Sequence, residues 1–208
     1  MENISLPTKI EFTPGEKTNE SIVSIQPCFP GYGTTLGSSL RRVLLSSLPG
    51  SAVTSFKIKG VSHEYTTIDN VKEDLVEIVL NLKQLRLKSH STEPVRLTLK
   101  ANGEKKVTAK DIDKNSDIEI ANPELVICTL TAKTAELEMD LIIDNGRGYV
   151  PSEQKNKEGL ETDMIIIDSI YTPIKNVGIK VDHLRVGQMT NYENLLLTIE
   201  TDGSISPE

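Results

Sequence analysis

The 208-residue sequence contains no tryptophan and only three phenylalanines and five tyrosines, so aromatic side chains contribute little to its core. The hydrophobic residues make up 37% of the chain and must build that core mainly from isoleucine, leucine and valine. No apolar run approaches the ~18 residues of a membrane span, and the opening Met-Glu-Asn-Ile has neither the basic start nor the apolar stretch of a signal peptide. We expect a cytoplasmic protein of one or two domains that makes no membrane contact.

Basic residues and metal-ligating residues are also few. Lys and Arg number 23 against 30 Asp and Glu, and a net charge of -7 argues against tight non-specific nucleic-acid binding by this chain. Cys28 and Cys128 have no local partner, which predicts buried thiols in a reducing compartment. His63, His90 and His183 are scattered along the chain. We therefore expect no metal site and no cofactor.

The most informative stretch is Gly31 to Gly50, which reads Gly-Tyr-Gly-Thr-Thr-Leu-Gly-Ser-Ser-Leu-Arg-Arg-Val-Leu-Leu-Ser-Ser-Leu-Pro-Gly. It predicts a helix that Thr34 or Thr35 caps and that Pro49-Gly50 ends. At 100° per residue one broad face is apolar, with Gly37 on its rim; its members are Leu36, Leu40, Val43, Leu44 and Leu48. Leu45 falls on the opposite side with Arg41 and Arg42, as either an ordinary surface leucine or part of a protein interface.

The glycines before this helix also suggest a phosphate cradle. The dinucleotide fingerprint needs its third glycine at position 36, where the chain has leucine, and the Gly-Lys-Ser/Thr of a P-loop is absent. Gly37 is better explained by the close approach of another helix. Gly146-Arg147-Gly148 is more typical of a turn than of an anion site, and no arrangement of acids, histidines and thiols indicates catalysis.

The rest of the chain predicts an α+β fold with much antiparallel sheet and a second helix. Asn70 and Glu73 have capping-box spacing, and Lys83 ends the helical pattern. Two strands around a turn at 13–16 are expected within residues 4–26. Period-two alternation dominates elsewhere, including 177–181 and 195–199. Asn102-Gly103 predicts a hairpin, and the strands around 125–129 and 137–143 are expected to pair. Residues 152–163 have the composition of a loop. The final Ser-Pro-Glu resembles a helix start, so we expect the natural protein to continue.

Several blocks, in order along nearly the whole chain, resemble the amino-terminal part of the bacterial RNA polymerase alpha subunit. They are the 31–50 stretch, Gly-Val-Ser-His-Glu-Tyr-Thr-Thr at 60–67, Glu-Asp-Leu-Val-Glu-Ile-Val-Leu-Asn-Leu-Lys at 73–83, Gly-Arg-Gly-Tyr-Val-Pro at 146–151, Asp-Ser-Ile-Tyr-Thr-Pro at 168–173 and Thr-Asp-Gly-Ser-Ile-Ser-Pro-Glu at 201–208. The resemblance implies a non-catalytic scaffold of a nucleotidyltransferase complex, which forms a homodimer and gathers the beta and beta-prime subunits for transcription.

The resemblance also implies a domain plan. A discontinuous dimerisation domain, 1–50 plus 173–208, would be interrupted by a mostly antiparallel β insert at 51–172. Family members continue into a further helix and a small domain that binds DNA, so no direct DNA contact is expected from this portion.

Site residues follow by position. The resemblance places Arg42 and Leu45, with Arg41 alongside, where the family's helix contacts the beta subunit. It places the apolar face of the helix in the dimer interface and its core. The expected contacts with the large subunits, including beta-prime, are Lys83 and the segment 167–173 with Ile167, Asp168, Tyr171 and Pro173. Two alternatives remain open at this point: a nucleotide-binding module that uses the glycines at 31–37, and a heterodimeric alpha-like subunit of an archaeal or eukaryotic polymerase.

Overall fold

The computed structural model describes residues 4–61, 63, 65–155, 161 and 163–208. The chain forms two compact units, one made of Met1–Leu48 with Thr172–Glu208 and the other of Pro49–Tyr171. We call them the split unit and the continuous unit. The family resemblance placed these joints at 50–51 and 172–173. No helix in the described part of the chain is long and apolar enough to cross a membrane.

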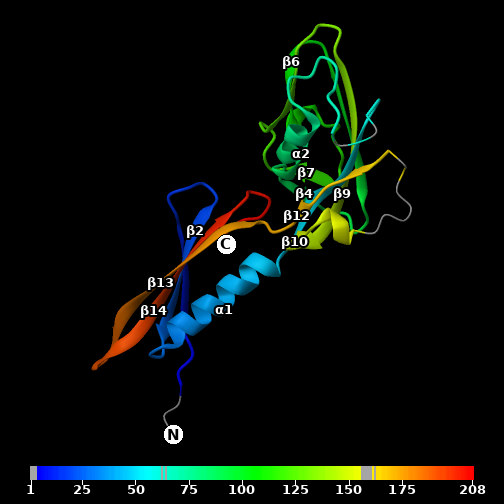
Figure 1. The fold of residues 1–208 in the computed structure, drawn as a ribbon. Coiled ribbons are helices and arrows are strands. Elements are labelled where there is room, and N and C mark those ends of the chain that lie inside the picture. Colours follow the sequence, from blue (N-terminus) through cyan, green and yellow to red (C-terminus); the bar gives the residue numbers. More distant parts are fainter. Residues whose placement is uncertain (1–3, 62, 64, 156–160, 162) are drawn as a thin grey trace. The chain divides into compact units, whose positions relative to one another are not determined.

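The split unit is one four-stranded antiparallel sheet with a helix on one face (Figure 1). Its strands are β1 (Lys9–Pro14), β2 (Glu20–Cys28), β13 (Ile174–Val186) and β14 (Met189–Thr201), in the order β1-β2-β14-β13. Helix α1 (Tyr32–Ser46) packs on β13 and β14. The β1–β2 pair around 13–16 is the one that the sequence predicted. The buried core of this unit consists of Val23, Cys28, Ile174, Val177, Leu195, Leu197 and Ile199.

The continuous unit is built on a larger sheet in the order β5-β9-β3-β4-β7. These strands are β3 (Pro49–Ile58), β4 (Leu87–Ser89), β5 (Val95–Asn102), β7 (Ile118–Ile120) and β9 (Glu136–Arg147), and β11 (Ile165–Ile166) pairs with β3. Helix α2 (Leu75–Lys83) contacts β3 and β8 (Val126–Leu130). Two small strand pairs belong to the same unit: β6 (Lys105–Thr108) pairs with β8, and β10 (Tyr149–Val150) pairs with β12 (Ser169–Ile170). The unit also contains the short helices η1 (Ala109–Asp111) and η2 (Ser152–Gln154).

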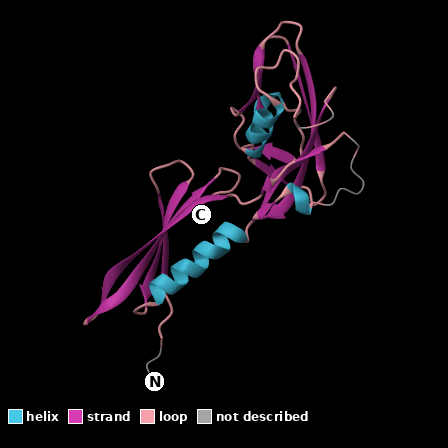
Figure 2. Ribbon diagram, viewed as in Figure 1, coloured by secondary structure: helices cyan, strands magenta, loops and turns pink. Residues whose placement is uncertain are grey.

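Strands make up most of the regular secondary structure in both units and pair antiparallel, which confirms the α+β prediction (Figure 2). Most residues in the core of the continuous unit are aliphatic, and Phe56 is the aromatic residue among its described members, as the scarcity of aromatic residues predicted. Cys28 and Cys128 are both buried free thiols, also as predicted. Alternation along β9 places Leu137, Met139, Leu141 and Ile143 inside, with the intervening acids partly exposed.

Two predicted strand pairings are wrong. Asn102-Gly103 does make a turn, with Gly103 at φ 79°, but β5 pairs with β9 and β6 pairs with β8. The two strands that flank the turn thus enter different sheets. The strands expected to pair at 125–129 and 137–143 likewise separate, because β3 and β5 occupy the two edges of β9 and β8 pairs with β6. The local turn signal was correct, but tertiary pairing determined the partners.

The predicted start of the second helix is also wrong. The cap is Asp74, whose side chain accepts a hydrogen bond of 2.7 Å from the Glu77 N–H. Asn70 instead adopts positive φ, and the Glu73 carboxylate accepts from the backbone N–H and hydroxyl of Thr129 at 2.6 and 2.9 Å. Glu73 is therefore a link between the approach to α2 and β8, not part of a solvated helix face. Lys83 ends the helix as predicted.

Candidate functional site

The amino-terminal end of α1 is held by a carboxylate from β14. Glu193 accepts hydrogen bonds from the backbone N–H groups of Gly31 and Gly33, at 3.0 and 2.8 Å. Gly31 takes the N-cap position at φ 82°, and no side chain of the helix itself caps it. The predicted cap by Thr34 or Thr35 is therefore wrong; the Thr35 hydroxyl bonds back to the Gly31 carbonyl at 3.4 Å. A negative side chain suits the positive end of the helix dipole.

The same geometry bears on the phosphate cradle considered above. The backbone N–H groups of Gly31 and Gly33 that would face a phosphate already bind the internal Glu193 carboxylate. A Cβ at position 33 would lie 2.8 Å from an oxygen of that carboxylate. The two glycines therefore leave room for the Glu193 side chain of β14 at the start of the helix. Because this carboxylate occupies the N–H groups, phosphate binding there is disfavoured.

Gly37 serves close packing, although its neighbour is a sheet and not the expected helix. A Cβ there would lie 2.9 Å from Leu195 Cδ1 and 3.0 Å from Ile179 Cγ2. Its backbone thus touches side chains of β14 and β13 directly. Leu36, Leu44 and Leu48 are half-buried against the same core.

The apolar face of α1 extends beyond the part that its own sheet covers. Leu40 is 38% exposed, Val43 is 52% exposed, and Tyr32, about two turns before Leu40, is 40% exposed. We call Tyr32, Leu40 and Val43 the open stripe. Their spacing places them along one line of the helix, between the buried glycines and the exposed serines.

Strand β1 leaves further apolar surface uncovered in the same unit. Its Ile10 and Phe12 pair in register with Ile25 and Val23 of β2, so they lie on the core side of the sheet. Yet they are 60% and 49% exposed. Helix α1 packs mainly on β13 and β14, at the other edge of the sheet from β1.

Leu45 does not lie on the exposed side of the helix as the wheel predicted. It is half-buried and packs against the core of the split unit. The buried arc of α1 is centred on Gly33 and Gly37 and is displaced from the apolar arc inferred from the sequence. Leu45 therefore lies at the margin of the buried arc, while Arg41 and Arg42 are exposed.

In the continuous unit, a polar cluster joins α2 to the segment before β12. Lys83 Nζ lies 2.8 Å from Asp168 Oδ2, and the other carboxylate oxygen accepts from the Ser152 N–H at 2.8 Å. The bond from Lys83, then that from Ser152, lowers the pKa of Asp168 well below its ordinary value. Both side chains are about a quarter exposed, so the pair is ordered and still reachable from solvent.

The other predicted contact residues in this region are buried. Ile167 and Tyr171 are 4% and 6% exposed, and a Cβ at Gly146 would lie 2.6 Å from the Tyr171 ring. Pro173 belongs to the split unit, is buried, and its carbonyl accepts from the Asp202 N–H at 2.9 Å. Of this predicted set, only Lys83 and Asp168 present side chains to solvent.

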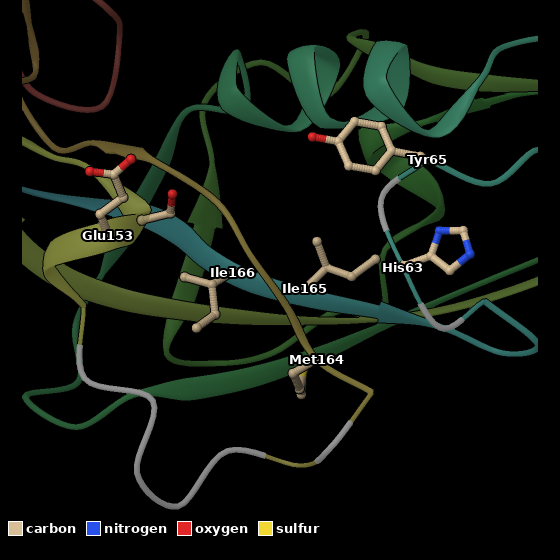
Figure 3. Close-up of a pocket in the computed structure, with 7 residues that line it drawn as sticks. His63, Tyr65, Glu153, Met164, Ile165 and Ile166 are labelled. Atoms are coloured by element: carbon tan, nitrogen blue, oxygen red, sulfur yellow. The ribbon is translucent and has the colours of Figure 1, made fainter.

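A pocket of about 410 Å³ in the continuous unit adjoins the polar cluster at Ser152. It is lined by His63, Tyr65, Ser152, Glu153, Met164, Ile165 and Ile166. Figure 3 shows Glu153 and His63 on opposite sides of the two isoleucines, so imidazole and carboxylate do not form a pair. Within the described ranges, no group of three His, Cys, Asp or Glu residues could hold a metal ion.

Two residues important in this geometry had no sequence signal that singled them out. Glu193 lies in an alternating strand, and only its register with the end of β2, opposite Cys28, brings it to α1. Lys155 lies in the polar stretch expected to be a loop, but its ammonium bonds to residues of the sheet. Neither position could have been found without the strand pairing.

Comparison with known proteins adds the family. A model described as the RNA polymerase Rpb3/RpoA insert domain matches residues 56–172. The chain is 47% identical over 207 residues to the DNA-directed RNA polymerase subunit alpha of Roseiflexus sp. (strain RS-1), covering 100% of the chain and 63% of that relative. The same subunit of Roseiflexus castenholzii (strain DSM 13941 / HLO8) is also 47% identical over 207 residues, with the same coverage.

A third relative agrees. The DNA-directed RNA polymerase subunit alpha of Alkaliphilus oremlandii (strain OhILAs) is 49% identical over 185 residues, which cover 89% of the chain and 58% of that protein. The chain thus spans less than two thirds of the length of these relatives. The matched insert model covers more than half of the chain, from β3 to the end of the continuous unit. This chain belongs to the RNA polymerase Rpb3/RpoA insert domain family.

Proposed function

We propose that the chain is a non-catalytic assembly scaffold of a bacterial DNA-directed RNA polymerase. In this proposal the split unit forms a homodimer, and separate surfaces of each copy bind the beta and beta-prime subunits in the cytoplasm. The curated relatives are alpha subunits of that enzyme. The chain needs no catalytic residue, cofactor, DNA contact or membrane contact for this role.

One observation carries the proposal: the split unit leaves a large part of its own core face uncovered. The open stripe on α1 and the side chains of Ile10 and Phe12 on β1 are exposed next to a small core. Exposed apolar patches of this kind typically mark protein interfaces. A second copy of the same unit offers a self-complementary cover, as a two-fold dimer requires.

The dimer part is tested by Val43→Asp. A carboxylate in the middle of the open stripe would be buried without a partner in the dimer, which costs several kcal/mol. We expect the wild-type chain to sediment as a dimer and the variant as a folded monomer. Lys175→Asp is the control, because it introduces the same side chain at an exposed position of the same unit. A wild-type monomer, or a variant that still dimerises, contradicts the proposed interface.

The docking part is tested by Arg42→Ala. Arg41 and Arg42 are exposed on α1, outside the buried arc, where guanidinium groups remain free to bind carboxylates of a partner. We expect Arg42→Ala to keep the dimer and to retain much less beta subunit in co-purification, with Lys175→Ala as the charge-matched control. Equal recovery of beta with both variants would rule out this role for Arg42. Leu45, being half-buried, would support the arginines by packing.

The second proposed docking surface is the pair Lys83–Asp168 in the continuous unit. Ile167, Tyr171 and Pro173 are buried, so under this proposal they shape the surrounding backbone instead of presenting side chains to a partner. Lys83→Ala should weaken binding to a large subunit, beta-prime included, without changing dimerisation. The matched control is Lys59→Ala, an exposed lysine of the same unit that pairs with Glu138.

Two other functions give different results in the same experiments. A nucleotide-binding module would bind nucleoside triphosphates at micromolar concentration in calorimetric titration, but Glu193 already occupies the backbone N–H groups such a site would use. A heterodimeric alpha-like subunit would not form a homodimer in sedimentation.

A further inference from the structure

Lys155, the residue directly after η2, donates hydrogen bonds from its ammonium group to strands β3 and β12 and to the residue between β11 and Asp168. Lys155 Nζ donates to the Thr54 carbonyl of β3 at 3.2 Å, to the Ser169 hydroxyl of β12 at 2.6 Å and to the Ile167 carbonyl. The Ser169 hydroxyl donates in turn to the Val53 carbonyl at 2.8 Å. An ammonium has three N–H donors, so all of them have acceptors.

These contacts lie beside Asp168, the residue that pairs with Lys83. Lys155 binds residues 167 and 169, directly before and after Asp168 in the chain. The Asp168 carboxylate is bound separately, by Lys83 and by the Ser152 N–H. The backbone on each side of Asp168 is therefore tied to β3 through Lys155, and Ser169 is buried to 1% exposure. Without the ammonium, the Ile167 carbonyl and the Ser169 hydroxyl lose a hydrogen bond in a poorly hydrated place.

We propose that Lys155 is a positioning residue: it fixes the backbone of residues 167–169 and thereby sets Asp168 against Lys83 in the orientation that the docking surface needs. This inference rests on the proposed docking role of the Lys83–Asp168 pair. Its structural half, the fixing of the segment, is independent of any partner.

The charged groups that act on Lys155 are Asp168 and Asp144, which favour its charged form, and Lys83, which opposes it. Burial outweighs them and lowers the pKa of Lys155 to about 8. At pH 7 the group therefore still carries the proton that gives it three N–H donors.

Hydrogen exchange of the Ile167 and Tyr171 amides tests the structural half, because these N–H groups bond to Thr54 and Gly148 at 3.0 and 2.8 Å. Lys155→Met should speed their exchange by about tenfold at pH 7, the effect of one lost charged hydrogen bond. Lys59→Met, at an exposed lysine, should leave it unchanged.

A chemically restored amine separates positioning from general damage. Lys155→Cys alkylated with bromoethylamine regains an ammonium at the right distance, while Cys28 and Cys128 are fully buried and protected from the reagent in the folded chain. Aminoethylation should restore slow exchange, and carboxymethylation should not. Unchanged protection in Lys155→Met, or equal rescue by both reagents, overturns the positioning role.

Binding of the same variants to the beta and beta-prime subunits tests the proposed link between Lys155 and docking. Lys155→Met should dimerise normally and bind a large subunit more weakly, with recovery after aminoethylation of Lys155→Cys. Full binding despite fast exchange would overturn the link between the segment and docking. If the wild-type chain binds neither large subunit, the proposed function fails, while the exchange measurement still decides whether Lys155 fixes the segment.

Discussion

The carboxylate of Glu193 should contribute measurably to the stability of helix α1. Replacing it by glutamine keeps the shape of the side chain but removes the charge and one of its two acceptor oxygens. Only one of the N–H groups of Gly31 and Gly33 can then keep its bond. The amide NH₂ would face the other as donor against donor.

The magnitude follows from the two hydrogen bonds. A hydrogen bond to a charged group contributes about 1.5–3 kcal/mol, and a negative charge at a helix start contributes about 0.3–1 kcal/mol. Because Glu193 is partly exposed, the lower ends apply. We expect Glu193→Gln to lower the free energy of opening of α1 by about 1–2 kcal/mol, and Glu193→Ala by about 2–3 kcal/mol.

Hydrogen exchange of the α1 amides is the appropriate assay, because the chain has two units and global unfolding need not be two-state. The control is Glu200→Gln on the same strand, where the carboxylate only pairs with an exposed Lys17 at 2.8 Å. Added acetate should partly restore protection in Glu193→Ala by filling the vacated place. Equal protection in wild type and Glu193→Gln would refute the capping role.

Further predictions concern packing, titration and reactivity. Gly37→Val should destabilise the split unit by about 1–3 kcal/mol in urea denaturation, because even a Cβ would meet Leu195 and Ile179 at 2.9 and 3.0 Å; an unchanged midpoint would show that the strand side chains yield freely. The lowered pKa of Asp168 gives stability that is present above the ordinary value of 3.8 and is lost as pH falls below it; exchange at residues 167–171 should show this loss, and Lys83→Met should reduce it. Burial raises the pKa of Cys128 to about 12, so iodoacetamide at pH 8 should label it only after unfolding; rapid labelling of the folded chain would contradict its burial.

The sequence contained enough information for the elements with strong local periodicity. The 31–50 stretch, the β1–β2 pair and the long strands of the carboxy-terminal hairpin have clear periods, and each forms where expected. The α+β class follows from them. The family resemblance then indicated a discontinuous plan that local patterns could not have supplied.

The errors arose where partners distant in the chain decide the outcome. Asn102-Gly103 is a correct turn whose flanking strands find other partners, and the start of α2 moved to Asp74 because Glu73 is drawn to β8. Leu45 was predicted to be exposed but packs against the core, because Gly33 and Gly37, and not the leucines, lie closest to the sheet. A helical wheel shows which residues are apolar but not which arc a neighbour covers.

Under the proposed function, two copies of this chain form a platform for one large subunit. Native mass spectrometry of the chain mixed with purified beta subunit measures the stoichiometry. We expect a complex of two copies of the 22.9 kDa chain with one beta subunit, which Val43→Asp abolishes and Lys175→Asp leaves intact. A complex with a single copy, or no complex with beta while the chain remains folded, would contradict it.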